Sequence, residues 1–145
     1  MLGKKEYGIG KRIRKEMEIR MLSCSFSVCT VEDYSQVDFA SDFCFTAKTD
    51  EENSLVCRTQ DVPDNVTARE DGWRAFRIQG KLDFSLIGIL ARISSLMADN
   101  GIGIFAVSTY RTDYVLTKRD DYDKAIEVLR NAGYEISGEQ QQAYC

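Results

Sequence analysis

Apolar and polar residues in the second half of the chain follow two periods, which together predict six elements. Residues 73–79 alternate around Phe76 and Ile78, which predicts a strand. Apolar residues between positions 86 and 97 recur at helical spacing, which predicts an amphipathic helix that ends near Gly101. The remaining predicted elements are strands over 104–108 and 114–118, an amphipathic helix from about 120 to 133, and a strand over 134–136.

The β-α-β-β-α-β order of these elements is that of the ferredoxin-like unit, an antiparallel sheet with both helices on one face. In the first half, apolar runs predict strands over 22–31, 43–47 and 55–58 and leave no room for a long helix. We therefore expect an α+β protein, with a ferredoxin-like unit over 71–137 preceded by a truncated, mostly β unit over 21–70. A polar connector over 59–72, which holds the only proline, should mark the boundary.

Both ends of the chain differ in character from the two units. Residues 1–17 carry six basic and two acidic side chains and few large apolar ones. We interpret residues 1–20 as a basic N-terminal extension that is mobile, or as the product of an upstream start with Met17 or Met21 as the natural one. Residues 138–145 are expected to form a polar tail.

Composition narrows the classes of function. The chain has 145 residues with 43% apolar content, which is enough for one compact core, and a formal net charge of -4, which argues against nucleic acid as the partner. It lacks an apolar run of the length that a membrane span requires and the apolar core of a secretory signal, so we expect no membrane contact and a cytoplasmic protein.

Histidine is absent, which removes the usual general base and the commonest metal ligand. The five cysteines include no C-x-x-C pair, so we expect neither a disulfide framework nor a metal site, and mostly reduced thiols. An enzyme is therefore the least favoured class. It would need Cys44 or Cys57 as a nucleophile with a pKa lowered by nearby basic groups.

The most informative tract is Gly101 to Asp113, which continues into the strand at 114–118. It describes two short strands around a polar turn, which sets several hydroxyl groups and one carboxylate beside buried backbone. Such a turn is a place where a small ligand can bind.

Three motifs resemble ACT domains: Gly72-Trp73-Arg74, Gly88-Ile89-Leu90, and the Ser-Thr-Tyr-x-Thr-Asp-Tyr-x-Leu run that begins at Ser108. More narrowly, the chain is similar to small bacterial tandem ACT-domain proteins that are themselves similar to the animal cytosolic arginine sensors. The resemblance covers residues 21–137 and implies a regulatory module that binds an amino acid, without a cofactor. It implies a ligand site made of Ile87, Gly88, Leu90, Ser108, Thr109, Tyr110, Thr112 and Asp113.

The chemistry of such a site can be stated for these residues. Free N–H groups at the start of the helix suit an α-carboxylate, and Gly88 lets a ligand approach the backbone. Asp113 can face the α-amino group. The helix glycine of relatives commonly follows Asp-Glu-x, but here it follows Ser85-Leu86-Ile87. Without those carboxylates, a neutral or smaller amino acid is favoured over arginine or lysine, or the site is empty.

Each of these residues also fits a purely structural role. Asp113 can satisfy turn amides, Ser108 and Thr109 are common turn residues, and Gly88 can permit close packing of helix on sheet. In that case the protein is an interaction adaptor that contacts a protein partner without a small ligand. Because exposed apolar sheet faces are unfavourable, we expect the helix-free face to pack against the first half, a second chain, or both, and we expect a homodimer.

Overall fold

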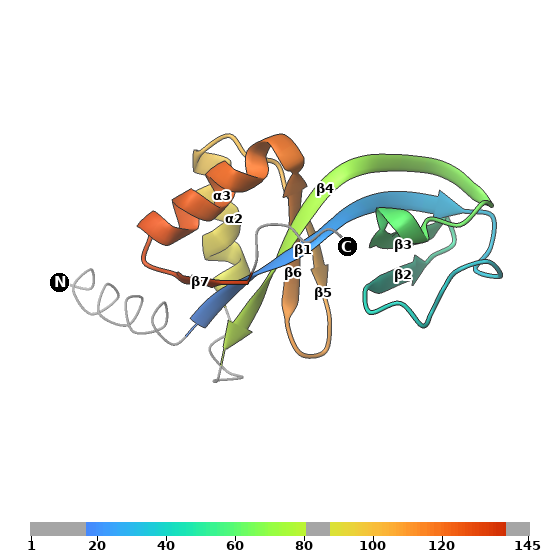
Figure 1. Cartoon of the computed structure of the whole chain (residues 1–145), viewed down its shortest axis with the longest axis horizontal. Coiled ribbons are helices and arrows are strands. Elements are labelled where there is room, and N and C mark those ends of the chain that lie inside the picture. Colours follow the sequence, from blue (N-terminus) through green and yellow to red (C-terminus); the bar gives the residue numbers. More distant parts are fainter. Residues whose placement is uncertain (1–16, 81–87, 139–145) are drawn as a thin grey trace.

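The computed structural model describes residues 17–80 and 88–138. Its elements, in chain order, are β1 (Met17–Val31), β2 (Cys44–Lys48), β3 (Asn53–Arg58), the 3-10 helix η1 (Thr59–Asp61), β4 (Val66–Gly80), α2 (Ile89–Asp99), β5 (Phe105–Ser108), β6 (Asp113–Lys118), α3 (Arg119–Asn131) and β7 (Glu135–Ser137). The predicted strand and helix order is confirmed, as is the α+β class. Figure 1 shows both helices on one side of a curled sheet.

The sheet contains seven strands in the order β2-β3-β1-β4-β6-β5, and β7 pairs with β1. All neighbouring pairs are antiparallel except β1 with β7, which is parallel. The second half of the chain supplies β4-α2-β5-β6-α3-β7, as the ferredoxin-like order predicts. Its last strand, however, does not pair with β4, because β1 lies between them.

The start of β1 is therefore part of the second unit's sheet. Met17 and Ile19 are fully buried in the core that α2 and α3 cover, and Ile19 lies opposite Ile78 of β4 and Ile136 of β7. The prediction that these residues belong to a mobile extension is wrong for Met17 to Arg20. Their alternation of buried and partly exposed side chains is that of a strand with one face in a core.

β1 and β4 are each 15 residues long and pass through both halves of the molecule as one antiparallel ribbon. Both unit boundaries expected from the sequence fall inside these strands. The polar connector is shorter than predicted, because β4 begins at Val66. Shifts in register between Met21 and Ser25 and between Phe26 and Val28 bend the ribbon.

The first half covers part of the helix-free face of β4, β6 and β5, as expected. Phe43, just before β2, and Phe45, in β2, place their ring centroids 6.4 and 5.0 Å from that of Tyr114 in β6. Phe43 also contacts Phe26 at 5.7 Å. These aromatic contacts belong to a second core cluster, on the opposite side of the sheet from the helices. Within the described ranges, no helix combines the length and the apolar character needed to cross a bilayer.

Candidate functional site

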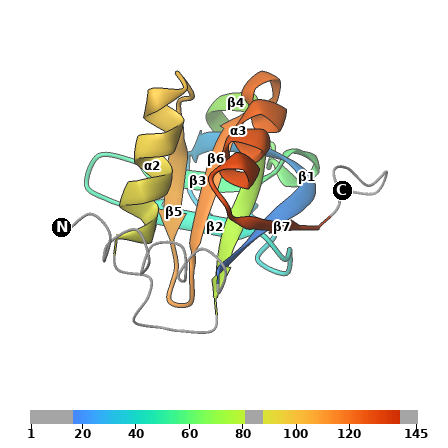
Figure 2. The same ribbon diagram turned by 90° about the vertical axis from the view of Figure 1, so that its left-hand side faces the viewer.

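Two segments that carry predicted site residues, the start of α2 and the turn between β5 and β6, lie at one end of the second unit. The end of β4 lies at the same end (Figure 2). Connectivity imposes this arrangement. α2 starts at the end where β4 stops, β5 runs back along the helix to that end, and β6 leaves it in the opposite direction.

The β5–β6 turn is held by its own threonines. The Thr109 amide donates to the Thr112 carbonyl oxygen at 2.8 Å, and the Thr109 hydroxyl donates to the same oxygen at 2.8 Å. Ser108 and Asp113 form the register pair at the base of the hairpin. Between the threonines, the side chain of Tyr110 is fully exposed. The Thr109 hydroxyl thus stabilises the turn, which is the structural role considered above, and the ring of Tyr110 faces solvent.

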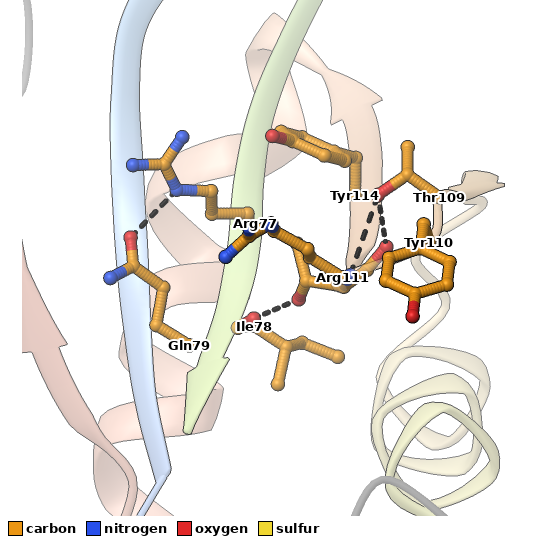
Figure 3. A pocket seen from close by; sticks show the side chains of 8 residues that line it. Arg77, Ile78, Gln79, Thr109, Tyr110, Arg111 and Tyr114 are labelled. Carbon is orange, nitrogen blue, oxygen red and sulfur yellow. Dashed lines mark hydrogen bonds between the residues drawn. The ribbon is translucent and has the colours of Figure 1, made fainter. Parts of the chain in front are cut away.

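A pocket of about 610 Å³ lies where β4 extends past β6. The last pair between these strands is Arg77 with Tyr114, so the final residues of β4 have no ladder partner on that side among the described residues. The hydroxyl of Thr112 donates to the carbonyl oxygen of Ile78 and ties the turn to β4. The pocket, drawn in Figure 3, is lined by Arg77, Ile78, Gln79, Thr109, Tyr110, Arg111, Thr112 and Tyr114.

Three of the predicted site residues, Thr109, Tyr110 and Thr112, line this pocket, and the other described ones do not. Ser108 and Asp113 lie at the base of the hairpin, and Gly88 and Leu90 lie at the start of α2. Among the described residues, no hydrogen-bond partner of the Asp113 carboxylate is found, so it does not satisfy the turn amides. Ile87 lies outside the described residues.

Gly88 precedes the first residue of α2 and has a φ of +82°. In that left-handed region a side chain is strained, so the backbone itself requires glycine. A Cβ atom at this position would meet no described atom within 4 Å. Close packing of helix on sheet is therefore not the reason for this glycine, and the space beside it is open.

Five pocket residues were not predicted: Arg77, Gln79, Arg111, Tyr114 and Ile78. The signal for the first two was present, because Arg77 and Gln79 follow Trp73 and Ala75 on the same face of the strand and make that face polar at its end. Arg111 occupies the unspecified position of the turn motif. Which polar strand end faces the turn depends on pairing between distant segments, and local periodicity does not report this.

The cysteines considered as nucleophiles lie in the first half, Cys44 in β2 and Cys57 in β3. Cys29, Cys44 and Cys57 are free thiols. A hydrogen bond with Cys29, together with burial, raises the pKa of Cys57, and burial raises the pKa of Cys44. A reactive thiol needs the opposite shift. These two cysteines are therefore structural members of the core.

Comparison with known proteins agrees with this architecture. A family model described as the ACT domain matches residues 68–131. The structure of protein Atu0741 from Agrobacterium tumefaciens is 30% identical with a TM-score of 0.75, and the match covers 86% of this chain and 94% of that one. Residues 68–131 of this chain are an ACT domain. In the ACT domain, the pocket lies at the end where β4 stops and α2 starts.

Two further structures share the fold at lower identity. VC0802 from Vibrio cholerae, described as a protein of unknown function and possible transport protein, is 14% identical with a TM-score of 0.68, covering 88% of this chain and 98% of that one. The ligand-free regulatory subunit of aspartate kinase from Thermus thermophilus is 9% identical with a TM-score of 0.56, covering 79% and 95%. At these identities the likeness concerns the ACT fold alone. No curated protein matches the chain.

Proposed function

We propose that this protein is a regulatory ACT-domain protein that binds an amino acid in the pocket between the end of β4 and the β5–β6 turn. The observation that carries the proposal is the pocket itself. Its volume of about 610 Å³ exceeds that of a free amino acid, and it is lined by the hydroxyl-bearing residues Thr109, Tyr110 and Thr112 of the motif that first suggested a ligand.

A solved structure with the same fold supports a regulatory role for this protein. The Thermus thermophilus chain with this fold is the regulatory subunit of an aspartate kinase. A ligand that binds one conformation of a protein better than another shifts the population toward that conformation, and this is how we expect such a unit to regulate. We place the protein in the cytoplasm. The narrower likeness to the animal cytosolic arginine sensors stays a prediction, as does the division into a truncated unit over 21–70 and a full unit over 71–137.

A homodimer is part of the proposal. β5 ends the sheet order, so the outer edge of Phe105–Ser108 has no strand partner among the described residues. A second copy that covers this edge would also stand close to the β5–β6 turn, where the pocket opens. Light scattering after size exclusion should give twice the mass of the chain, and a monomer at micromolar concentration would contradict this part.

Thermal-shift measurements with each of the twenty amino acids test ligand binding. At a concentration 100 times its Kd, a ligand of the native state contributes about 2.7 kcal/mol of stability, which raises the midpoint of unfolding by several degrees. We expect at least one amino acid to produce this shift. If none raises the midpoint at 10 mM, a concentration of about 100 times a 0.1 mM Kd, the ligand-binding proposal fails.

The full exposure of Tyr110 favours a second candidate, an adaptor that contacts a protein without a small ligand. An aromatic ring at the tip of a turn, surrounded by polar groups, is a common anchor in protein interfaces. In this case a partner captured from lysate would bind equally with and without amino acids. Tyr110→Ser would abolish its capture and leave the fold unchanged.

A further inference from the structure

Among the described residues that line the pocket, the charged ones are both positive: Arg77 on β4 and Arg111 in the β5–β6 turn. No aspartate or glutamate of the described ranges is among the lining residues. Figure 3 shows the Arg111 side chain extending from the turn in the direction of β4, on which Arg77 lies. A ligand in this pocket therefore meets two guanidinium groups, each with several N–H donors that suit carboxylate oxygens.

No acidic group in the part of the chain that the structure describes neutralises either arginine. The Nε atom of Arg77 donates to the neutral Oε1 of Gln79 at 2.6 Å. Among the described residues, no carboxylate forms an ion pair with Arg77 or Arg111. Other arginines do have acidic partners, since Arg58 pairs with Asp61 at 2.8 Å, Arg69 with Asp71 at 3.0 Å and Arg130 with Glu127 at 2.7 Å.

A third arginine adds to the positive charge. The register between β1 and β4 places Arg20 directly opposite Arg77, and residues opposite each other in an antiparallel pair share a face of the sheet. Two like charges in this position repel each other. Glu18, two residues before Arg20 in β1, lies opposite Gln79 and forms no ion pair with Arg77. A bound anion would offset this repulsion.

We infer that the pocket selects an amino acid with an anionic side chain, of the aspartate and glutamate class. The inference rests on the proposed function and specifies its ligand. Of the ligand's two carboxylates, one would meet Arg77 and the other Arg111. The hydroxyl of Tyr110 and the amide oxygen of Gln79 can accept hydrogen bonds from the ammonium group. The ring of Tyr114, held against Phe43 and Phe45, forms an apolar wall for the methylene groups.

Matched ligand pairs test this choice. Titration calorimetry on the full chain would compare L-glutamate with L-glutamine, and L-aspartate with L-asparagine. The members of each pair differ only in the side-chain group, which is a charged carboxylate in one and a neutral amide in the other. Because a charge-assisted hydrogen bond to arginine is worth about 1.5–3 kcal/mol, we expect the acidic member to bind at least about tenfold more tightly. L-arginine and L-lysine should not bind, since like charges would meet in the pocket.

Substitutions identify the groups responsible. Arg77→Gln and Arg111→Gln should each weaken glutamate binding at least about tenfold. The variant that lacks the arginine facing the side-chain carboxylate should leave any weak binding of glutamine unchanged, whereas the other variant should weaken it too. Arg92→Gln is the matched control, because Arg92 is an exposed arginine of α2 that lines a different pocket. It should leave glutamate affinity unchanged. Circular dichroism and the unfolding midpoint of the free protein check that each variant is folded.

The possible results distinguish a failure of this inference from a failure of the proposed function on which it rests. If a neutral amino acid binds as tightly as glutamate, or if both arginine variants retain full affinity, the selectivity is wrong and amino-acid binding stands. If succinate or inorganic phosphate binds as tightly as glutamate, the pocket recognises anions and not an acidic amino acid, which also overturns the inference. If no amino acid binds, the proposed function itself fails.

Discussion

Replacing Ile19 by alanine tests whether the start of β1 is part of the ACT fold or an extension of it. The side chain of Ile19 is 0% exposed and lies between Ile78 of β4 and Ile136 of β7. It belongs to the same core cluster as Ile93 of α2 and Leu129 of α3. A mobile segment would contribute nothing at this position, so the two interpretations predict different stabilities.

The magnitude follows from the burial. Ile19→Ala removes three carbon atoms from a site without solvent, and about 0.8 kcal/mol per buried carbon gives about 2.4 kcal/mol. The cavity that remains between two strands and two helices raises the cost, so we expect a loss of about 3–4 kcal/mol. Since domains of this size are stable by about 5–15 kcal/mol, the variant should fold and should melt about 10 °C lower.

Urea denaturation followed by fluorescence provides the assay, because Trp73 is the only tryptophan and its ring contacts Phe105 in the sheet at 6.2 Å. Ile19→Val should lose only about 1 kcal/mol. Phe39→Ala is the control for removing a large apolar side chain, since Phe39 is 63% exposed, and it should stay within about 0.5 kcal/mol of the parent. A loss below 0.5 kcal/mol for Ile19→Ala would refute the integral role of β1.

Three other changes have defined outcomes. Ser27→Ala should cost about 1–3 kcal/mol at pH 7 by urea denaturation, because the buried hydroxyl donates to Asp71 Oδ1 at 2.5 Å. This hydrogen bond lowers the pKa of Asp71, so its contribution to the free energy of unfolding is complete above about pH 4 and is lost as the pH falls through the lowered pKa. If Ser27→Ala were destabilised relative to the parent by as much at pH 2 as at pH 7, this would be contradicted. Burial raises the pKa of Tyr122 to about 12, so the folded protein should lose stability as the pH rises above about 10, and Tyr122→Phe should remove part of that loss in alkaline melting curves. Gly138→Ala should lower the unfolding midpoint, because φ is +91° and a Cβ atom would collide with a backbone carbonyl oxygen; an unchanged midpoint would show that the turn can move.

The order of strands and helices was predictable from the sequence because each element carries its own period. The length of the polar connector predicted over 59–72 was overestimated for a physical reason. The residues from Thr67 to Asp71, near the start of β4, are exposed and, apart from Ala68, polar. They show no apolar alternation although Ala68, Arg69 and Glu70 pair with β1. The insertion of β1 between β4 and β7 was not predictable, since pairing between the two ends of a chain leaves no local pattern.

The site was predictable only where a local motif defines it. Thr109, Tyr110 and Thr112 are adjacent in sequence, and their turn chemistry places them together in the pocket. Arg77 reaches the same pocket from a strand far away in sequence. Its role depends on where β6 stops pairing with β4, and this register is set by the packing of the whole sheet.

The parallel pairing of β7 with β1 has a consequence for how the molecule is made. These are the last and the first strands that the structure describes, so every described element between them has been synthesised before the two can meet. Contacts of such long sequence separation are slow to form. Until then, the β1 edge at Glu18 to Arg20 stays open, and the helices are synthesised before the sheet beneath them is complete. The sheet of the ACT fold should therefore be completed only after β7 has left the ribosome, in a single late step.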